Sequence, residues 1–503
     1  MPLQLATESK VLTCSSTGQS ISLIKQLATS GEGEVWRTNI AGYLAKIYHH
    51  PDSQRIRKLE VMIANPPQDP NAQIKHTSFA WPKSLLRDER GQSIGFLMPQ
   101  IVDSVEILDV YNPRRRQAVV PGFNWLYLHA TAVNIASIIA AIHRAGYVLG
   151  DIKPQNILVN NQALASIIDT DSFQVKDSET QAIYRCPVGS EGFTPPELLG
   201  QDLATTDQTE IHDRFRLGVI IYLLLFGDHP FKGKWVGKGD SPEPHQLLRQ
   251  GFWPYGMNSL IQPGPLTIPL DTVHPELQKC FQRCFTDGHA HPELRPSAQK
   301  WFSTLQLALK ELKVCRKNPR HYHSESYGKC YWCDRQRQLG VDIFPRELNW
   351  LETKSKTLSN RFKRTVKKTN IKAAKLQKRQ KLTPTLNLAQ LISKASISVP
   401  KFSQPGKLAP KAALSASSPG LGTSNGFKSP TLQGQGVTDN KLLIWGLASF
   451  FALSGLIIAL INLVGDVEMS DRQWGSTMFA IAIGLGLLGM AGLLLKWTRS
   501  ENL

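Results

Sequence analysis

Two long uncharged runs near the end of the chain set the strongest limit on its fold. The run LLIWGLASFFALSGLIIALINLV covers residues 442–464, and WGSTMFAIAIGLGLLGMAGLLL covers residues 474–495. A helix needs about 20 apolar residues to cross the hydrocarbon core of a bilayer. A pair of buried core helices is the alternative, but two adjacent uncharged runs of this length favour a transmembrane hairpin over residues 441–497.

The charges around this hairpin predict its orientation. The connecting loop GDVEMSDRQ is net acidic, whereas Lys441, Lys496 and Arg499 flank the helices. Cytoplasmic flanks carry an excess of Lys and Arg, so both ends are expected in the cytoplasm. The N-terminal residues lack the basic start and apolar run of a signal peptide. We therefore expect a multi-pass protein of the cell (inner) membrane whose N-terminal region is cytoplasmic and free of disulfides.

A basic segment, residues 349–440, precedes the hairpin. Between Thr353 and Lys411 it holds sixteen Lys or Arg and no Asp or Glu, so most of the net charge of +18 lies there. Its Ser, Pro and Gly content predicts a disordered linker. It is a solvated tether, or its Lys residues contact anionic lipid head groups of the bilayer. Nucleic acid is the least favoured partner, because interleaved aromatic residues are absent.

The larger part of the chain, residues 20–312, predicts a mixed fold. Short runs typical of β-strands come first, such as GEVWRTN and GYLAKIYH. A long amphipathic helix follows, LYLHATAVNIASIIAAIHRAG, and most of the later pattern is helical. Strands first and helices later indicate an α+β domain in two lobes.

One stretch within this domain, YVLGDIKPQNILVNNQALASIIDTDSFQV, carries the groups that phosphoryl transfer needs. Asp151 can orient a hydroxyl nucleophile and accept its proton, and Lys153 can neutralise charge on the transferred phosphate. Asn156 and Asp169 offer the oxygen ligands that Mg²⁺ prefers. The spacing therefore predicts a site for phosphoryl transfer from a nucleotide.

The stretch DIKPQN resembles the catalytic loop of bacterial eukaryotic-like (Hanks-type) serine/threonine protein kinases, and Asp169 stands at the spacing of their metal-binding Asp. The resemblance covers about residues 20–312 and implies the two-lobed kinase fold with ATP and Mg²⁺ as cofactors. It also implies structural roles for Ser190, Asp213, Glu197 and Arg295, the last two of which would form an ion pair.

The resemblance extends to the N-terminal lobe in a weaker form. The segment ATSGEGEV resembles a Gly-rich phosphate loop, but Ala28 and Ser30 stand where its first two glycines usually occur. The resemblance implies that Lys46 grips the nucleotide phosphates, although an ordinary surface lysine is the alternative. The residues it assigns to ATP binding are Gly31, Gly33, Val35, Lys46 and, as the ion-pair partner of Lys46, Glu60.

Two departures from the family pattern concern regulation. Leu149-Gly150 replaces the usual His-Arg, so the Arg that would meet a phosphorylated activation loop is missing. Thr170-Asp171 replaces Phe-Gly, as in a bacterial subgroup with the sequence Asp-x-Asp-Ser-Phe that this chain resembles. Asp171 either joins Asp169 at the metal or caps a turn, and the cap is the favoured interpretation.

Residues 313–348 form a short segment rich in Cys and His. Cys330 and Cys333 make a C-x₂-C pair, which is half of a common structural zinc site. A redox pair or plain packing is the alternative. The candidate zinc ligands are Cys315, His321, His323, Cys330 and Cys333.

Together these features predict a membrane-anchored serine/threonine protein kinase that transfers the ATP γ-phosphate to protein substrates. Because the motifs depart from the family pattern, a pseudokinase that binds nucleotide or acts as a scaffold is the main alternative. A small-molecule kinase of the same fold is the other, and the activation-segment match around Ser190 counts against it.

Overall fold

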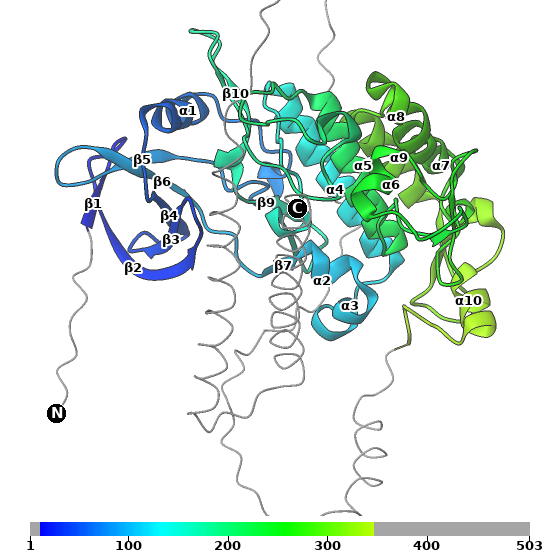
Figure 1. The fold of residues 1–503 in the computed structure, drawn as a ribbon. Helices are drawn as coiled ribbons and strands as arrows, with labels where there is room; N and C mark the ends of the chain where they lie inside the picture. Colours follow the sequence, from blue (N-terminus) through cyan, green and yellow to red (C-terminus); the bar gives the residue numbers. More distant parts are fainter. Residues whose placement is uncertain (1–10, 347–503) are drawn as a thin grey trace, which may run out of the picture. The chain divides into compact units, whose positions relative to one another are not determined.

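The structure, a computed structural model, describes residues 11–346 (Figure 1). The predicted linker over residues 349–440 and the predicted transmembrane hairpin over residues 441–497 lie outside the described residues. Within residues 11–346 the strand-rich part comes first and the helix-rich part follows, which confirms the α+β order expected from the sequence.

The first lobe is a closed barrel of six antiparallel strands, in the order β1-β2-β3-β4-β6-β5. Pairing of Thr13 with Arg87 joins β1 to β5 and closes the barrel. Alternate residues point inward, as the period of a strand requires, so Leu12, Ala45 and Leu86 are buried together. The strands are β1 Val11–Cys14, β2 Ser20–Thr29, β3 Gly33–Thr38, β4 Tyr43–Tyr48, β5 Ser84–Arg87 and β6 Ser93–Pro99.

Helix α1 (Ser53–Ala64) follows β4 and contacts the barrel. The carboxylate of Asp52 accepts a hydrogen bond from the backbone N–H of Arg55, which caps the first turn. Leu59 and Met62 are fully buried, and Leu59 packs with Tyr48 of β4 and Phe96 of β6. One face of α1 is therefore fixed against the strands that carry the candidate nucleotide site.

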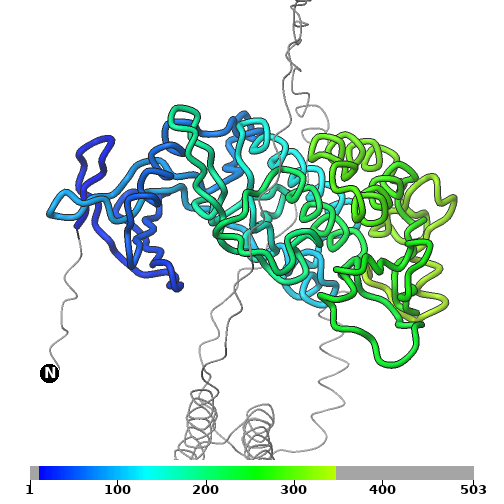
Figure 2. Tube along the Cα trace, turned by 45° about the horizontal axis from the view of Figure 1, so that its top comes forward, coloured from blue at the N-terminus to red at the C-terminus, as the bar shows by residue number. Residues whose placement is uncertain are grey.

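The second lobe is built around the long helix α4, which packs against two further long helices, α5 and α9 (Figure 2). The central one, Trp125–Arg144, is apolar around nearly its whole circumference, which suits a helix buried on all sides. The helices of this lobe are α2 Ile107–Tyr111, α3 Pro113–Val119, α4 Trp125–Arg144, α5 Glu210–Phe226, α6 Pro244–Arg249, α7 Pro275–Gln282, α8 Gly288–Ala290, α9 Ala298–Lys310 and α10 Tyr331–Leu339.

Among the helices of residues 11–346, only α4 has the length and hydropathy of a membrane span. It lies in the core of the second lobe, where 94% of that stretch is buried.

A sheet of short strands positions the catalytic stretch in this lobe. Its strand order is β7-β8-β9, with β7 at Ser104–Glu106, β8 at Ile157–Asn160 and β9 at Ala165–Ile167. The other strands form two-stranded pairs, which are β10 Val175–Lys176 with β11 Ile183–Tyr184, β12 Lys234–Trp235 with β13 Ile261–Gln262, and β14 Leu312–Val314 with β15 Tyr322–Ser324.

The Cys/His segment packs directly on the second lobe. Trp332 of α10 meets Trp125 of α4 edge-on, with ring centroids 5.1 Å apart. The buried guanidinium of Arg116 donates to the carbonyl of Ile343 at 3.2 Å. The segment is therefore part of the same hydrophobic core as α4.

Candidate active site

Lys46 on β4 reaches two carboxylates of the segment that follows β9. Its Nζ donates to Oδ1 of Asp169 at 2.9 Å and to Oδ1 of Asp171 at 2.8 Å, and the residue is only 6% exposed. Burial alone would lower the pKa of Lys46, but attraction to Asp171 and then Asp169 outweighs burial and raises it. The ammonium group is therefore held charged beside the predicted metal-binding Asp.

Asp171 has both carboxylate oxygens engaged. Lys46 Nζ lies 2.7 Å from Oδ2, and the hydroxyl of Tyr48 donates to the same oxygen at 2.8 Å. Burial would raise the pKa of Asp171, but Lys46 and the hydrogen bond from Tyr48 lower it below its usual value. The side chain thus contacts Lys46 and Tyr48 rather than a backbone N–H of its turn, so the favoured turn-cap interpretation is wrong, and the metal-ligand interpretation stays a prediction. Asp171 is a buried ion-pair partner of Lys46.

Glu60 does not reach Lys46. It lies on the exposed side of α1 and pairs with Arg57 at 3.3 Å. The inward position of that turn belongs to Lys58, which is buried, and two residues along a helix are about 200° apart, so Glu60 must face away. The expected Lys46–Glu60 pair is therefore replaced by Lys46–Asp171.

Asp151 is buried and held by two side chains. Lys153 Nζ donates to Oδ2 at 2.5 Å, and the hydroxyl of Ser190 donates to Oδ1 at 2.7 Å. The amide nitrogen of Asn156 donates to the backbone carbonyl of Asp151 at 3.3 Å. Lys153 and Ser190 of the activation segment thus orient the carboxylate that would receive a proton.

The two predicted metal ligands flank neighbouring strands, with Asn156 directly before β8 and Asp169 shortly after β9. The backbone N–H of Ile168 donates to the carbonyl of Asn156 at 2.9 Å, which places Asn156 beside Asp169. Asp169 adopts a left-handed backbone conformation with φ of 60°, and the hydroxyl of Ser172 holds its carbonyl at 2.8 Å. A non-glycine residue in this conformation is a strained position of the kind that clusters at active sites.

The candidate phosphate loop connects β2 to β3. A Cβ on Gly33 would lie 2.3 Å from the carbonyl oxygen of Ile47, so the close approach of β3 to β4 requires glycine there. Gly31 has open space around it. Val35 is paired with Lys46 across the two strands, and Glu32 at the tip of the loop lies 3.9 Å from Lys46. The loop therefore lies beside Lys46.

The missing Arg before Asp151 is explained by packing. Gly150 has φ of +74°, and a Cβ there would lie 2.6 Å from the Cβ of Cys186 in the activation segment. The carboxylate of Asp213 accepts hydrogen bonds from the N–H groups of Leu149 and Gly150 at 2.7 and 3.0 Å. Arg216 donates to Asp213 at 3.2 Å from within the core. A buried arginine of α5 thus neutralises Asp213 near the position of the missing side chain.

Side-chain contacts anchor the segment after Asp169, where Thr170-Asp171 replaces the Phe-Gly of the family pattern. Thr170 donates its hydroxyl to the carbonyl of Ala80 at 2.9 Å, and Phe173 packs edge-on against Trp81. The indole of Trp81 donates to the carbonyl of Met62 in α1 at 2.8 Å. One aromatic side chain thereby ties α1 to the metal-binding segment.

Glu197 and Arg295 form a bidentate ion pair. The two guanidinium nitrogens lie 2.6 and 2.8 Å from the two carboxylate oxygens, and the Nε of Arg295 donates to the carbonyl of Gly288 at 2.7 Å. Arg295 is only 1% exposed. The pair ties the end of the activation segment to the second lobe.

Four of the five Cys/His candidates gather at one point. The ligand atoms of Cys315, His321, Cys330 and Cys333 all lie within 4.8 Å of one another. His321 is fully buried, its Nδ1 faces the sulfurs of Cys330 and Cys333, and its Nε2 lies 3.0 Å from Asp342. His323 lies outside this cluster, on β15.

Sequence reasoning missed Tyr48, Lys58, Cys186, Arg216 and Asp342. For Tyr48 a signal existed, because it follows Lys46 by two residues and so shares its face of the strand. The other four depend on contacts between distant segments, which one sequence does not reveal.

Known proteins match this chain as follows. The protein kinase domain model matches residues 104–303. The match confirms the expected kinase fold for the lobe that carries Asp151 and Asp169. The protein kinase YegI of Escherichia coli K12 is 33% identical over 350 residues, which is 68% of this chain and 52% of YegI. This chain thus spans about half the length of that relative.

Two further comparisons are more distant. A probable serine/threonine-protein kinase of Clostridium perfringens, CPE1738, is 29% identical over 101 residues, which is 20% of this chain and 14% of that protein. The structure of the ROP18 kinase domain in complex with AMP-PNP and sucrose covers 60% of this chain and 85% of that one, with 16% identity and a TM-score of 0.39.

Proposed function

We propose that this chain is a serine/threonine protein kinase that transfers the γ-phosphate of ATP to hydroxyl groups of protein substrates. The observation that carries the proposal is the meeting of Lys46, Asp151 and Asp169 from three separate segments at one site. Lys46 contacts Asp169, which lies beside Asn156, and Asn156 is hydrogen-bonded to Asp151. The resemblance of DIKPQN to the catalytic loop of serine/threonine kinases supports transfer to a Ser or Thr hydroxyl.

Each side chain has a role that follows from its position. Asn156 and Asp169 supply the amide and carboxylate oxygens that suit Mg²⁺, which when bound neutralises charge on the nucleotide phosphates. Lys46 binds phosphate oxygens through its ammonium group. Asp151 accepts the proton of the substrate hydroxyl, while Ser190 and Lys153 hold its carboxylate in position.

The test is phosphoryl transfer by the full chain. We expect transfer of labelled γ-phosphate to the chain itself or to a generic protein substrate, dependent on Mg²⁺. MgATP binding without any transfer would favour the pseudokinase, and transfer to small molecules alone would favour a small-molecule kinase.

We propose further that the Cys/His cluster binds structural Zn²⁺ through Cys315, His321, Cys330 and Cys333. Three thiolates and one imidazole form a common tetrahedral zinc donor set, and Asp342 orients the histidine as outer carboxylates do in zinc sites. Metal analysis is expected to find about one Zn²⁺ per chain. The His321→Ala variant should lose the metal, whereas the matched His323→Ala variant should keep it. A metal-free wild-type chain would contradict the proposal.

Membrane anchoring also remains a proposal, because residues 441–497 lie outside the described part of the chain. Its support is the two uncharged runs and the basic residues that flank them. A reporter fused after Leu503 should respond as a cytoplasmic one, and an external response would contradict the orientation. Anionic lipid contact by the linker would appear as salt-sensitive binding to vesicles.

A further inference from the structure

The buried carboxylate partner of Lys46 is Asp171, which comes from the segment after β9 and not from α1. Lys46 lies within 2.8 Å of both oxygens of Asp171. Asp171 lies in the turn Thr170–Ser172, two residues after the predicted metal-binding Asp169. The hydroxyl of Tyr48, on the same face of β4 as Lys46, donates to Oδ2 of Asp171 as well. Both oxygens of this buried carboxylate are therefore engaged by groups of β4.

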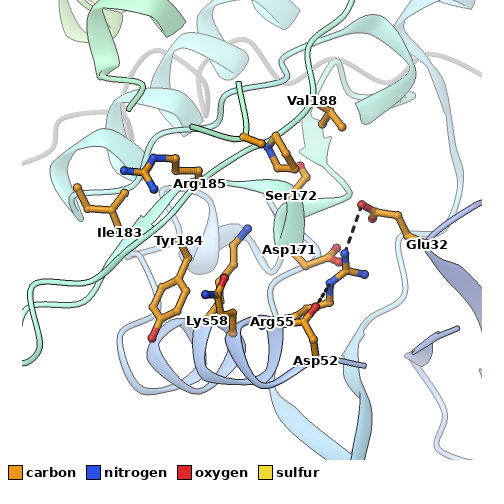
Figure 3. Close-up of a pocket in the computed structure, with 13 residues that line it drawn as sticks. Glu32, Asp52, Arg55, Lys58, Asp171, Ser172, Ile183, Tyr184, Arg185 and Val188 are labelled. Carbon is orange, nitrogen blue, oxygen red and sulfur yellow. Dashed lines mark hydrogen bonds and ion pairs between the residues drawn. The ribbon is translucent and has the colours of Figure 1, made fainter. Parts of the chain in front are cut away.

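Helix α1 carries the opposite charge at the position that faces this site. Lys58 is 8% exposed, and it projects from α1 into a cavity of about 280 Å³ that Asp171 and Glu32 also line (Figure 3). No hydrogen bond or ion pair of Lys58 occurs among the contacts of residues 11–346, and the largest attraction on its charge comes from Asp171. Burial lowers the pKa of Lys58 to about 8.

The side chain that α1 turns toward this site is therefore a cation, whereas the family resemblance implied a carboxylate there. A helix carboxylate at position 58 would compete with Asp171 for Lys46, and two buried carboxylates beside one ammonium would repel each other. With lysine at that position, Asp171 is attracted by two cations, Lys46 from the strand and Lys58 from the helix. Glu60, which faces solvent, has no part in this site.

We propose that Asp171 is the positioning residue that anchors Lys46 for nucleotide binding, and that Lys58 on α1 stabilises Asp171. The inference rests on the proposed function, because it assigns the residue that orients the phosphate-binding lysine of that same site. It has a structural consequence. Lys46 is coupled to the segment that carries Asp169, so a shift of this segment would disturb metal binding and lysine placement together.

The first test compares two carboxylates by their effect on MgATP affinity. The Asp171→Asn variant should bind MgATP roughly tenfold or more weakly, because a charged hydrogen-bond partner of Lys46 is lost. The Glu60→Gln variant should bind as the wild type does. The Mg²⁺ concentration for half-maximal nucleotide binding should rise in Asp169→Asn but stay unchanged in Asp171→Asn, which separates an anchor from a metal ligand.

The second test moves the carboxylate to the helix. Lys58→Glu combined with Asp171→Asn places an acid on α1 within the same cavity, and the double variant should recover most of the affinity lost in Asp171→Asn. Lys58→Glu alone should weaken binding, because it crowds two acids around Lys46. Equal unfolding midpoints among the variants show that the affinity changes do not come from loss of fold.

The outcomes separate this inference from the proposed kinase activity. Wild-type chain that binds MgATP without transferring phosphate would overturn the activity, while the affinities would still decide the anchor. Unchanged affinity in Asp171→Asn, or a loss in Glu60→Gln as large as in Asp171→Asn, would overturn the anchor alone. Absence of MgATP binding by the wild type would overturn both.

Discussion

The Asp151→Asn variant is expected to transfer phosphate roughly 10²–10⁴-fold more slowly than the wild type, with nearly unchanged MgATP affinity. Asparagine keeps the shape of the side chain: its amide oxygen can accept from Lys153, and its NH₂ group can donate to the hydroxyl oxygen of Ser190. It cannot take the proton of a substrate hydroxyl. The effect should therefore appear in kcat, measured with saturating MgATP, and the dissociation constant of MgATP should move little.

A matched control is Asp240→Asn, which makes the same chemical change at an exposed position in the second lobe. It should leave both kcat and nucleotide affinity unchanged. If Asp151→Asn retained the wild-type rate, the assignment of Asp151 as the proton acceptor would be wrong, even if the chain were an active kinase.

The Arg295→Ala variant should lose about 3–5 kcal/mol of unfolding free energy, because it leaves Glu197 without its buried partner. It also removes the hydrogen bond to the carbonyl of Gly288 and the contact of the guanidinium with the ring of Phe215. Denaturant unfolding of both proteins measures the difference. Lys279→Ala breaks an exposed ion pair with Glu276 of similar length and serves as the control, with no measurable change expected.

The same pair makes the effect of Arg295→Ala depend on pH. Burial would raise the pKa of Glu197, but the hydrogen bonds and charge of Arg295 outweigh burial and hold this pKa below its usual value. A carboxylate whose pKa is lower in the folded chain stabilises the fold above its unfolded pKa and loses that contribution as the pH falls through the folded value. The stability difference between wild type and Arg295→Ala should therefore shrink below about pH 4.5. A difference that stayed constant there would contradict the role of the pair.

Several features of the site could be predicted from the sequence because they depend on local spacing. Asp151, Lys153 and Asn156 lie in one loop, and a short hairpin carries the chain from there to Asp169. The position of Lys46 on the strand after the phosphate loop likewise followed from the order of the segments, since β3 and β4 are consecutive in the chain and pair with each other. The C-x₂-C spacing of Cys330 and Cys333 indicated a cluster for the same reason.

The partners of these groups were decided by tertiary structure. The rotation of α1, set by the burial of Leu59 and Met62, turns Lys58 inward and Glu60 outward, whereas the family resemblance implied that Glu60 faces Lys46. The choice of His321 over His323 follows from which of the two faces the sulfurs of Cys330 and Cys333.

By itself, then, the sequence determined which chemical groups are present, their order along the chain and the α+β order of the described elements. Only the tertiary structure decided that Asp171 holds Lys46, 125 positions away along the chain. The physical reason is that an ion pair depends on the distance between two charged atoms. That distance is set by how lobes and helices pack, whereas a motif records only separation along the chain.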